Sequence, residues 1–524
     1  MLRSPYPDVE IPDVPFTDYV LRRAPELGDR PALIDAPSGR TLTYAGLLEG
    51  VGRVAAGLAS RGFGRGDVFA HYAPNLPEYA VAFHAVATVG GVNTTANPLL
   101  TADELGAQLA DCRATLMVTV PALLHKAMAA AERAGVEEVF VYGEAPGATP
   151  FAELLATTGH PPKVRIDPAS DLVALPYSSG TTGLPKGVML THRNLAANIA
   201  QIWDLHHLGE HDRTIAVLPF FHIYGLVPIL NAGLAKGVTI VTMPRFELPD
   251  FLRTLQDHRI TRAYVVPPIA LALAKHPLVD DYDLSSLEYV MSGAAPLGPE
   301  LQKACGERLG VKTVQGYGMT EASPVTHIVA DDDADRAPGS VGRLVPNTEC
   351  RVVDVLSQED VPPGEAGELL IRGPQVMRGY LANPQATAHT LDEDGWLHTG
   401  DIGRADADER FWIVDRVKEL IKYKGYQIAP AELEAVLIAH PRIREAAVIP
   451  VPDEEAGEIP KAFVAAEEGL SVADVMAFVA ERVAPYKKLR AVELTDQIPK
   501  SASGKILRRV LVERERARAT PASS

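Results

Sequence analysis

The sequence predicts an α/β protein with a large N-terminal lobe and a small C-terminal α+β domain. Between residues 237 and 320, short β-branched runs alternate with amphipathic helical stretches, which is typical of parallel α/β layers. After Arg416 the pattern changes to helix, strand, strand, helix and a basic tail, which indicates a separate unit of about a hundred residues. We therefore predict domains at 1–416 and 417–524.

The elements can be justified in chain order. Leu47, Val51, Val54, Ala55 and Leu58 recur at helical spacing and predict a helix with one apolar face. The alternating region predicts, by the same period rules, strands at 238–241, 263–266 and 289–291 and helices at 249–258 and 269–274. Turn residues at 331–339 and 362–367 border strands expected at 350–355 and 368–371, which indicates a β-rich subdomain of the large lobe.

The small domain is expected to contain a helix at 430–439, strands at 446–451 and 462–466, and a helix at 471–483. Ser471 and Asp474 have the spacing of a helix-capping pair. After this helix we expect a final basic tail.

Composition excludes several classes of protein. The chain has 524 residues, and its formal net charge of -17 opposes binding to nucleic acid or to an anionic membrane surface. Cys112, Cys305 and Cys350 are far apart, which argues against a zinc site or a disulfide framework. No uninterrupted apolar run reaches the roughly 18 residues of a membrane span, and no leader pattern follows Met1. These features predict a cytoplasmic protein.

The run at 177–188, YSSGTTGLPKGV, predicts a phosphate cradle. Three glycines allow backbone N–H groups to turn toward an anion, and Lys186 adds a positive charge. Hydroxyl donors are supplied by Ser178, Ser179, Thr181 and Thr182. The run departs from the G-x-x-x-x-G-K-[ST] pattern, so a P-loop kinase or ATPase is not predicted.

Two further motifs suit nucleotide chemistry. In 315–321, QGYGMTE, Tyr317 offers a flat face for a purine, Thr320 can hydrogen-bond a phosphate, and Glu321 can hold Mg²⁺. In 395–401, GWLHTGD, a glycine-rich turn presents Asp401, whose carboxylate can accept both hydroxyls of a ribose.

Two basic segments complete the pattern. Arg416, Lys418, Lys422 and Lys424 lie at the predicted domain boundary, where charged residues alone indicate a solvated surface. In 499–509, PKSASGKILRR, Gly504 and the serines allow a bend that projects Lys505 away from the small domain.

Together and in this order, these segments resemble the superfamily of adenylate-forming enzymes, which includes acyl-CoA synthetases, firefly-type luciferases and peptide-synthetase adenylation domains. Similarity to the 4-coumarate:CoA ligase group rests on 219–225 (PFFHIYG), 292–297 (SGAAPL) and 414–430 (VDRVKELIKYKGYQIAP). The resemblance implies a two-step ligase that uses ATP, Mg²⁺ and coenzyme A. An acyl-AMP forms first, and the CoA thiol then attacks its acyl carbon.

The resemblance also implies roles for individual residues. Catalytic roles fall to Lys505, Glu321, Thr320 and His222, and Glu321 is the implied magnesium ligand. The implied ATP and CoA residues are Ser178, Ser179, Gly180, Thr181, Thr182, Lys186, Ala294, Gln315, Gly316, Tyr317, Asp401, Arg416, Lys418, Lys422, Lys424 and Gly425. Between the two steps the small domain is expected to swing about Val417 and Lys418, which withdraws Lys505 and brings Lys422, Lys424 and Gly425 toward the nucleotide and CoA.

An aryl acid is the expected substrate, bound by Tyr224, Pro228, Ala294, Gly316 and Gly318. His222 argues against an amino acid, because related amino-acid-activating enzymes place an aspartate near this position. Pro228 stands where plant coumarate ligases often carry a serine, so the 4-hydroxyl lacks that partner and Tyr224 is left to bind it. A medium- or long-chain fatty acid is the alternative substrate. Two further alternatives are a luciferase-like oxygenase and a non-catalytic adenylate-binding module. This chain lacks the His-His-Gly segment that is characteristic of the oxygenase. The intact Lys505 loop argues against the non-catalytic module.

Overall fold

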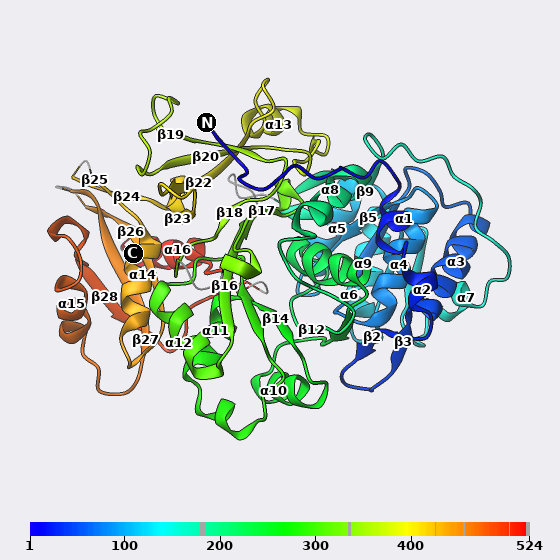
Figure 1. Ribbon diagram of the computed structural model, residues 1–524, viewed down its shortest axis with the longest axis horizontal. Coiled ribbons are helices and arrows are strands. Elements are labelled where there is room, and N and C mark those ends of the chain that lie inside the picture. Colours follow the sequence, from blue (N-terminus) through cyan, green and yellow to red (C-terminus); the bar gives the residue numbers. More distant parts are fainter. Residues whose placement is uncertain (179–184, 334–336, 425, 454–455, 502–503, 520–524) are drawn as a thin grey trace, which may run out of the picture.

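The computed structural model describes residues 1–524 except 179–184, 334–336, 425, 454–455, 502–503 and 520–524. Figure 1 shows a wide N-terminal lobe, a small sheet near the N-terminus at the top of the view, and a C-terminal unit at the left. The fold confirms the predicted α/β class with a β-rich subdomain and a small α+β unit.

The first sheet of the large lobe is built by the first part of the chain. Its neighbouring strands β9, β5, β4, β6 and β7 are parallel, whereas β11 joins β9 in the antiparallel sense. The bounds are β4 (Val68–Tyr72), β5 (Val92–Thr95), β6 (Ala114–Thr119), β7 (Glu138–Val141), β9 (Leu172–Ala174) and β11 (Lys186–Thr191). All residues of β4 and β5 are buried, as expected for central parallel strands that are covered on both faces.

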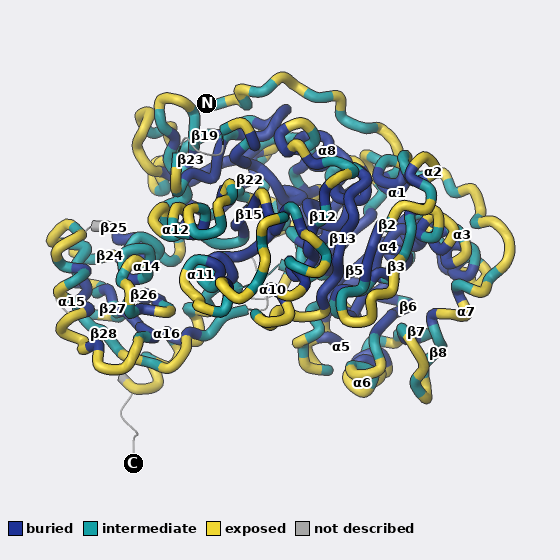
Figure 2. The backbone as a smooth tube through the Cα atoms, turned by 60° about the horizontal axis from the view of Figure 1, so that its bottom comes forward, coloured by how far each residue is buried: buried dark blue, intermediate teal, exposed yellow. Residues whose placement is uncertain are grey.

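The second sheet carries the strands predicted between residues 237 and 320. Its order is β18-β17-β16-β15-β14-β12-β13-β2-β3. The bounds are β2 (Pro31–Asp35), β3 (Thr41–Thr43), β12 (Arg213–Ala216), β13 (Thr239–Thr242), β14 (Arg262–Val265), β15 (Tyr289–Ser292), β16 (Lys312–Gly318), β17 (Val325–Ile328) and β18 (Arg343–Leu344). Figure 2 shows buried backbone at β12 and β13 of this sheet and at β5 of the first.

This second sheet is mixed rather than fully parallel. The central strands are parallel as predicted, but β17, β18 and β3 pair with their neighbours in the antiparallel sense. The connection from β16 to β17 spans only residues 319–324, which is too short for the crossover that a parallel pair requires.

The predicted first helix is α3 (Tyr44–Ser60), and all five residues of its apolar face are buried. Thr43 caps it by accepting a hydrogen bond of 3.0 Å from the Gly46 N–H. Helices α4 (Pro77–Thr88), α5 (Ala102–Cys112), α6 (Leu124–Ala134) and α8 (His192–Ile202) also belong to this lobe, as do α10 (Leu248–Asp257), α11 (Pro267–Lys275) and α12 (Pro299–Leu309).

The β-rich subdomain is an antiparallel sheet. It contains β1 (Leu2–Arg3), β19 (Glu349–Val353), β20 (Gly367–Arg372), β22 (Leu397–Ala405) and β23 (Phe411–Arg416), in this order. β1 extends the sheet because the N-terminal segment runs alongside Glu349 and Cys350. The register of β22 and β23 places Asp401 opposite Arg416, which matters for the cavity described below.

The C-terminal unit has a sheet of its own. Its strands are β24 (Ile421–Tyr423), β25 (Tyr426–Ile428), β26 (Ile443–Asp453), β27 (Gly457–Ala466) and β28 (Ala491–Leu494), and its helices are α14 (Pro430–Ala439), α15 (Val472–Ala480) and α16 (Arg508–Ala519). Ser471 and Asp474 form the predicted capping box of α15.

The predicted end of one helix in this unit was wrong, and the tail has a helix that was not predicted. α15 ends at Ala480 rather than at residue 483. The basic tail is helical, as α16, because Leu511 is buried against Ile449 and Phe463. We propose that the boundary between domains 1–416 and 417–524 lies in the single turn of 3₁₀ helix at Val417–Glu419, which connects β23 to β24. Among the described residues, no helix is both long and apolar enough to cross a membrane.

Candidate active site

A cavity of about 670 Å³ brings together segments that are far apart in the sequence. It is lined by residues from the large lobe and by the Lys505 loop of the C-terminal unit. The predicted site residues that line it are Ser178, His222, Tyr224, Pro228, Ala294, Gly316, Tyr317, Gly318, Thr320, Glu321, Arg416, Lys418 and Lys505.

Tyr317, Asp401 and Arg416 form one polar group at this cavity. The Tyr317 hydroxyl donates a hydrogen bond of 2.7 Å to Asp401 Oδ2, and Arg416 Nε lies 3.1 Å from Asp401 Oδ1. Burial raises the pKa of the Asp401 carboxyl, whereas the Arg416 charge and the Tyr317 hydrogen bond act in the opposite direction. The β22–β23 register therefore sets a carboxylate and a guanidinium side by side next to an aromatic ring.

Glu321 is the centre of a second polar group. It is 3 % exposed, and its Oε1 accepts hydrogen bonds from the Ser178 hydroxyl at 2.7 Å and the Tyr380 hydroxyl at 2.9 Å. Lys186 Nζ lies 4.8 Å from the centre of the Tyr380 ring. The start of the predicted phosphate cradle thus reaches the Glu321 carboxylate. Ser179, Gly180, Thr181 and Thr182 of that cradle lie outside the described residues.

Lys505 enters the cavity from a tight loop. The Ser501 N–H donates to the Lys505 carbonyl at 2.8 Å, and Gly504 adopts the left-handed conformation with φ +77°. A Cβ at Gly504 would lie 3.0 Å from Val266 Cγ2, so a glycine lets the loop approach the large lobe closely. Burial and the Arg416 charge lower the pKa of Lys505, while Asp401 and Glu321 oppose that shift.

Arg508 holds the base of the Lys505 loop. Its Nη2 lies 2.6 Å from Glu434 Oε2 on α14, and its Nη1 pairs with Glu419 of the turn between β23 and β24. The Glu434 Oε1 atom also accepts a hydrogen bond of 2.7 Å from the Val448 N–H. The loop is thus tied to the core of the C-terminal unit.

A less polar part of the cavity is walled by the segment after β12. His222 Nδ1 accepts a hydrogen bond of 3.2 Å from the Tyr224 N–H, and burial, followed by the nearby Lys505, lowers the pKa of His222 to about 3. The imidazole is therefore neutral near pH 7. The Tyr224 hydroxyl donates to the Met291 carbonyl at 3.3 Å. A Cβ at Gly293 would lie 2.9 Å from the Tyr224 ring, so this glycine allows the ring to pack against the backbone.

Some predicted residues lie elsewhere. Gln315 does not line the cavity; its amide bonds the Leu297 N–H and carbonyl at 2.8 and 2.9 Å and so braces the loop that carries Ala294. Lys422 and Lys424 are exposed on the C-terminal unit and are not part of the lining. Gly425 lies outside the described residues.

Glycine is needed at position 318 for a reason that the sequence analysis did not predict. A Cβ there would lie 2.1 Å from the Pro324 carbonyl oxygen. Glycine is therefore required by the close return of the chain into β17, in addition to any effect on cavity width.

Several lining residues were missed by the sequence analysis. They are Trp203, His206, Lys236, Tyr264 and Tyr380. None lies in a glycine-rich or basic motif, so local pattern gave no signal for them. Their positions depend on the order of strands and on the turn after α8.

The comparisons with known proteins agree with this geometry. A family model described as AMP-binding enzyme matches residues 20–381, and the model of the AMP-binding enzyme C-terminal domain matches residues 432–505. The chain belongs to the AMP-binding enzyme family. This finding confirms the resemblance to adenylate-forming enzymes that the motifs indicated.

Relatives of this AMP-binding enzyme include 4-coumarate–CoA ligase 5 of Oryza sativa subsp. japonica, which is 47% identical over 98% of this chain and 96% of its own length. 4-Coumarate–CoA ligase 2 of Nicotiana tabacum is 43% identical with the same coverage. Among solved structures, the anthranilate CoA ligase AuaEII in complex with anthranoyl-AMP has a TM-score of 0.90 at 28% identity, covering 98% of this chain and 99% of that chain. A benzoate CoA ligase from Burkholderia xenovorans LB400 has a TM-score of 0.86 at 27% identity, with 95% and 99% covered.

Proposed function

We propose that this AMP-binding enzyme is an ATP-dependent aryl acid:CoA ligase that acts on acids of the 4-coumarate type. One observation carries the proposal: a single cavity joins the Lys505, Arg416 and Glu321 charges to a compartment walled by Tyr224 and Pro228. An acid bound in that compartment presents its carboxylate to the charged part. The identity of 43–47% with 4-coumarate–CoA ligases over nearly the whole chain supports the same assignment.

In the first half-reaction, a carboxylate oxygen of the acid attacks the α-phosphorus of ATP. The new O–P bond gives acyl-AMP, and the bond to the leaving pyrophosphate breaks. Both reactants are anions, so charge stabilisation is the main requirement. We assign Lys505 to the carboxylate and α-phosphate, Arg416 to the ribose and phosphate, and Asp401 to the ribose hydroxyls. Tyr317 and Ala294 border the adenine in this assignment.

The phosphate side is assigned to Ser178, Lys186, Thr320 and Glu321. Glu321 fits Mg²⁺, because one of its oxygens is oriented by Ser178 and Tyr380 and, among the described residues, Oε2 accepts no hydrogen bond. The described residues contain no cluster of three or more His, Cys, Asp or Glu that would hold a metal ion. A single protein carboxylate suits Mg²⁺ that arrives with ATP, since phosphates and water supply the other ligands. Bound there, Mg²⁺ would neutralise phosphate charge.

In the second half-reaction, the CoA sulfur attacks the acyl carbon, its proton is lost, and the C–O bond to AMP breaks. Lys422, Lys424 and Gly425 are assigned to this step. Because Lys422 and Lys424 lie outside the cavity lining when Lys505 is inside it, the assignment requires rotation of the C-terminal unit about Val417 and Lys418.

The proposal is tested by mixing the protein with ATP, Mg²⁺, CoA and 4-coumarate and following AMP and thioester by mass. We expect both products in equal amounts, and loss of both when EDTA removes Mg²⁺. AMP without thioester would point to another acceptor than CoA. Thioester with hexanoate or palmitate but not with 4-coumarate would contradict the aryl assignment.

A further inference from the structure

A buried polar cluster borders the cavity beyond the residues assigned to the reaction. Lys505, His222, Tyr224 and Tyr264 line the same cavity, and the Tyr224 N–H donates a hydrogen bond to His222. Tyr264 in turn makes an edge contact with His206, at 6.3 Å between ring centres. His206 also lines the cavity, in the turn after α8. One cavity therefore contains both Lys505 and His206 in its lining.

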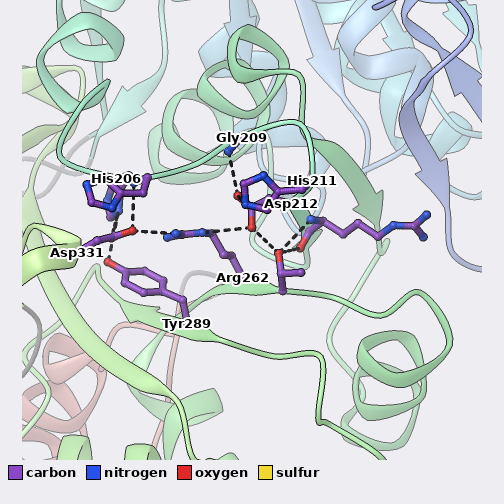
Figure 3. Close-up of polar contacts among 10 residues, drawn as sticks. His206, Gly209, His211, Asp212, Arg262, Tyr289 and Asp331 are labelled. Atoms are coloured by element: carbon purple, nitrogen blue, oxygen red, sulfur yellow. Dashed lines mark hydrogen bonds and ion pairs between the residues drawn. The ribbon is translucent and has the colours of Figure 1, made fainter.

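The cluster fixes the orientation of His206. Its Nδ1 lies 3.1 Å from Asp331 Oδ1 and 3.3 Å from the Tyr289 hydroxyl. Figure 3 shows Arg262 between Asp331 and Asp212, with Nη2 donating to Asp331 Oδ2 at 2.7 Å. The three residues His206, Asp331 and Arg262 are each at most 7 % exposed. A histidine held in this way has one nitrogen committed to the protein.

The charge state of Asp331 determines whether Nε2 of His206 can accept a hydrogen bond. Burial alone would raise the pKa of Asp331, but hydrogen bonds from His206 and Arg262 hold it below its ordinary value. An ionised carboxylate only accepts hydrogen bonds, so Nδ1 of His206 must be the donor. In neutral His206 the second nitrogen, Nε2, is then an acceptor.

Nε2 is available to a ligand. Within the part of the chain that the structure describes, no protein group hydrogen-bonds Nε2, and it is not among the fully buried polar atoms that lack a partner. Apolar side chains that line the same cavity include Ile199, Ile202, Leu208 and Ala232. Pro228 offers no side-chain donor or acceptor, and Lys236 Nζ lies 3.9 Å from the centre of the Trp203 ring.

We propose that His206 accepts a hydrogen bond through Nε2 from a hydroxyl at the ring end of the aryl acid, and that it makes the enzyme selective for hydroxylated aryl acids. This inference rests on the proposed aryl acid:CoA ligase function. His206, in the turn after α8, would then bind the hydroxyl, whereas the Pro228 side chain cannot.

The test compares 4-coumarate with 4-fluorocinnamate, whose fluorine is close to a hydroxyl in size but cannot donate a hydrogen bond. His206→Asn is the informative variant, because the Asn amide can still donate to Asp331 while Nε2 is removed. We expect kcat/KM for 4-coumarate to fall about tenfold or more, with 4-fluorocinnamate changed by less than about threefold. His207→Leu is the matched control, because this neighbouring histidine is exposed and does not line the cavity. It should leave the ratio of the two acids unchanged.

Two results would overturn the role of His206. The first is an unchanged ratio of the two acids in His206→Asn, whether or not both rates fall, and the second is a ratio that changes in Lys236→Leu instead. Should His206→Asn fail to fold, the wild-type protein decides, because acyl-AMP formation within twofold for the two acids contradicts the proposal. Failure of the proposed function looks different: the wild-type protein would then use neither aryl acid but convert an aliphatic one, and the role of His206 would fall with it.

Discussion

At the scale of single residues, the side chains around Lys505 matter mainly through their charges. Lys505 and Arg416 are cations that line one cavity, and the buried carboxylates of Asp401 and Glu321 are the anions that offset them. Removing a cation leaves a buried carboxylate with less compensation, which costs more than losing a surface ion pair. Effects of substitution should therefore be specific to the half-reaction in which each charge meets the ligand.

Lys505→Ala is expected to lower acyl-AMP formation by at least about a hundredfold, because the charge facing the carboxylate and α-phosphate is lost. Thioester formation from supplied acyl-AMP should stay close to wild type. The measurements are pyrophosphate release without CoA and thioester formation from synthetic acyl-AMP. Lys500→Ala is the control on the same loop, since Lys500 pairs with Glu445 at 2.6 Å outside the cavity and should change neither rate greatly. An equal loss in both steps would contradict the assignment of Lys505.

The pH dependence of the first step follows from the lowered pKa of Lys505. A lysine with a lowered pKa loses its proton, and its positive charge, at a lower pH than an ordinary lysine. Pyrophosphate release should therefore decline on the alkaline side before ordinary lysines titrate, whereas thioester formation from supplied acyl-AMP should not share that decline. Lys505→Arg keeps its charge at these pH values and should lose the alkaline decline in its remaining activity. A decline that persists in Lys505→Arg would assign it to another group.

At the scale of elements, the turn between β16 and β17 places several polar residues of the cavity lining, to which we assign the nucleotide. Tyr317 is the last residue but one of β16, and Thr320 and Glu321 follow in a single 3₁₀ turn (Thr320–Ala322). The Met319 N–H bonds the Pro324 carbonyl at 3.0 Å, which closes the turn. Because Gly318 lies against the same carbonyl, this turn tolerates no side chain there.

Gly318→Ala is expected to lower stability by about 1–3 kcal/mol, because the new Cβ would overlap the Pro324 carbonyl and force the backbone to shift. The KM for ATP should rise as well, since Tyr317 and Glu321 move with the turn. Gly52→Ala in α3 is the control: a Cβ there meets no atom within 4 Å, and the change should raise stability by about 0.5–1 kcal/mol. Thermal midpoints and ATP kinetics check both. Equal midpoints for Gly318→Ala and wild type would show that the turn relaxes freely.

At the scale of the whole molecule, the placement of the C-terminal unit decides which residues reach the cavity. Lys275 Nζ donates to the Ile438 carbonyl of α14 at 3.0 Å, and Gly504 packs on Val266. The start of α12 also meets α14, since a Cβ at Gly298 would lie 3.4 Å from Ala435 Cβ. These contacts accompany the insertion of Lys505.

The close approach of Gly298 and Ala435 allows a disulfide to hold the C-terminal unit in the position that inserts Lys505 into the cavity. The Cβ separation in Gly298→Cys/Ala435→Cys is close to that of a disulfide, and the native Cys112, Cys305 and Cys350 are all buried. We expect the oxidised double variant to release pyrophosphate but to form thioester at least about tenfold more slowly, with recovery on reduction. Each single cysteine variant is a control for the substitution itself. Normal thioester formation in the oxidised protein would contradict the proposed rotation.

Lys424→Glu tests the face that the rotation would bring to the cavity. Lys424 is exposed on the C-terminal unit and is not in the lining. We expect thioester formation to fall by about tenfold or more because a cation near the anionic CoA and AMP is replaced by an anion. Pyrophosphate release without CoA should be nearly unchanged, and a matching defect there would contradict the assignment.

Much of this organisation could be predicted from the sequence because its signals are local. The helix at α3 follows from apolar spacing, and the glycine and hydroxyl motifs at Tyr317 and Asp401 follow from what a nucleotide needs. Local signals failed where packing decides: α16 is a helix because Leu511 finds a buried place, and Gln315 braces a loop because Leu297 lies beside it. Neither partner is near in sequence.

The sequence by itself determined the α/β class, the family resemblance and the residues suited to ATP chemistry, because these depend on short-range patterns and on the chemistry of residue types. Only the tertiary structure decided which distant residues share the cavity. His206 meets Asp331 across 125 residues, and Arg262 meets Asp331 across 69. The physical reason is that a buried hydrogen bond depends on distance and orientation in space, and strand order and register set these.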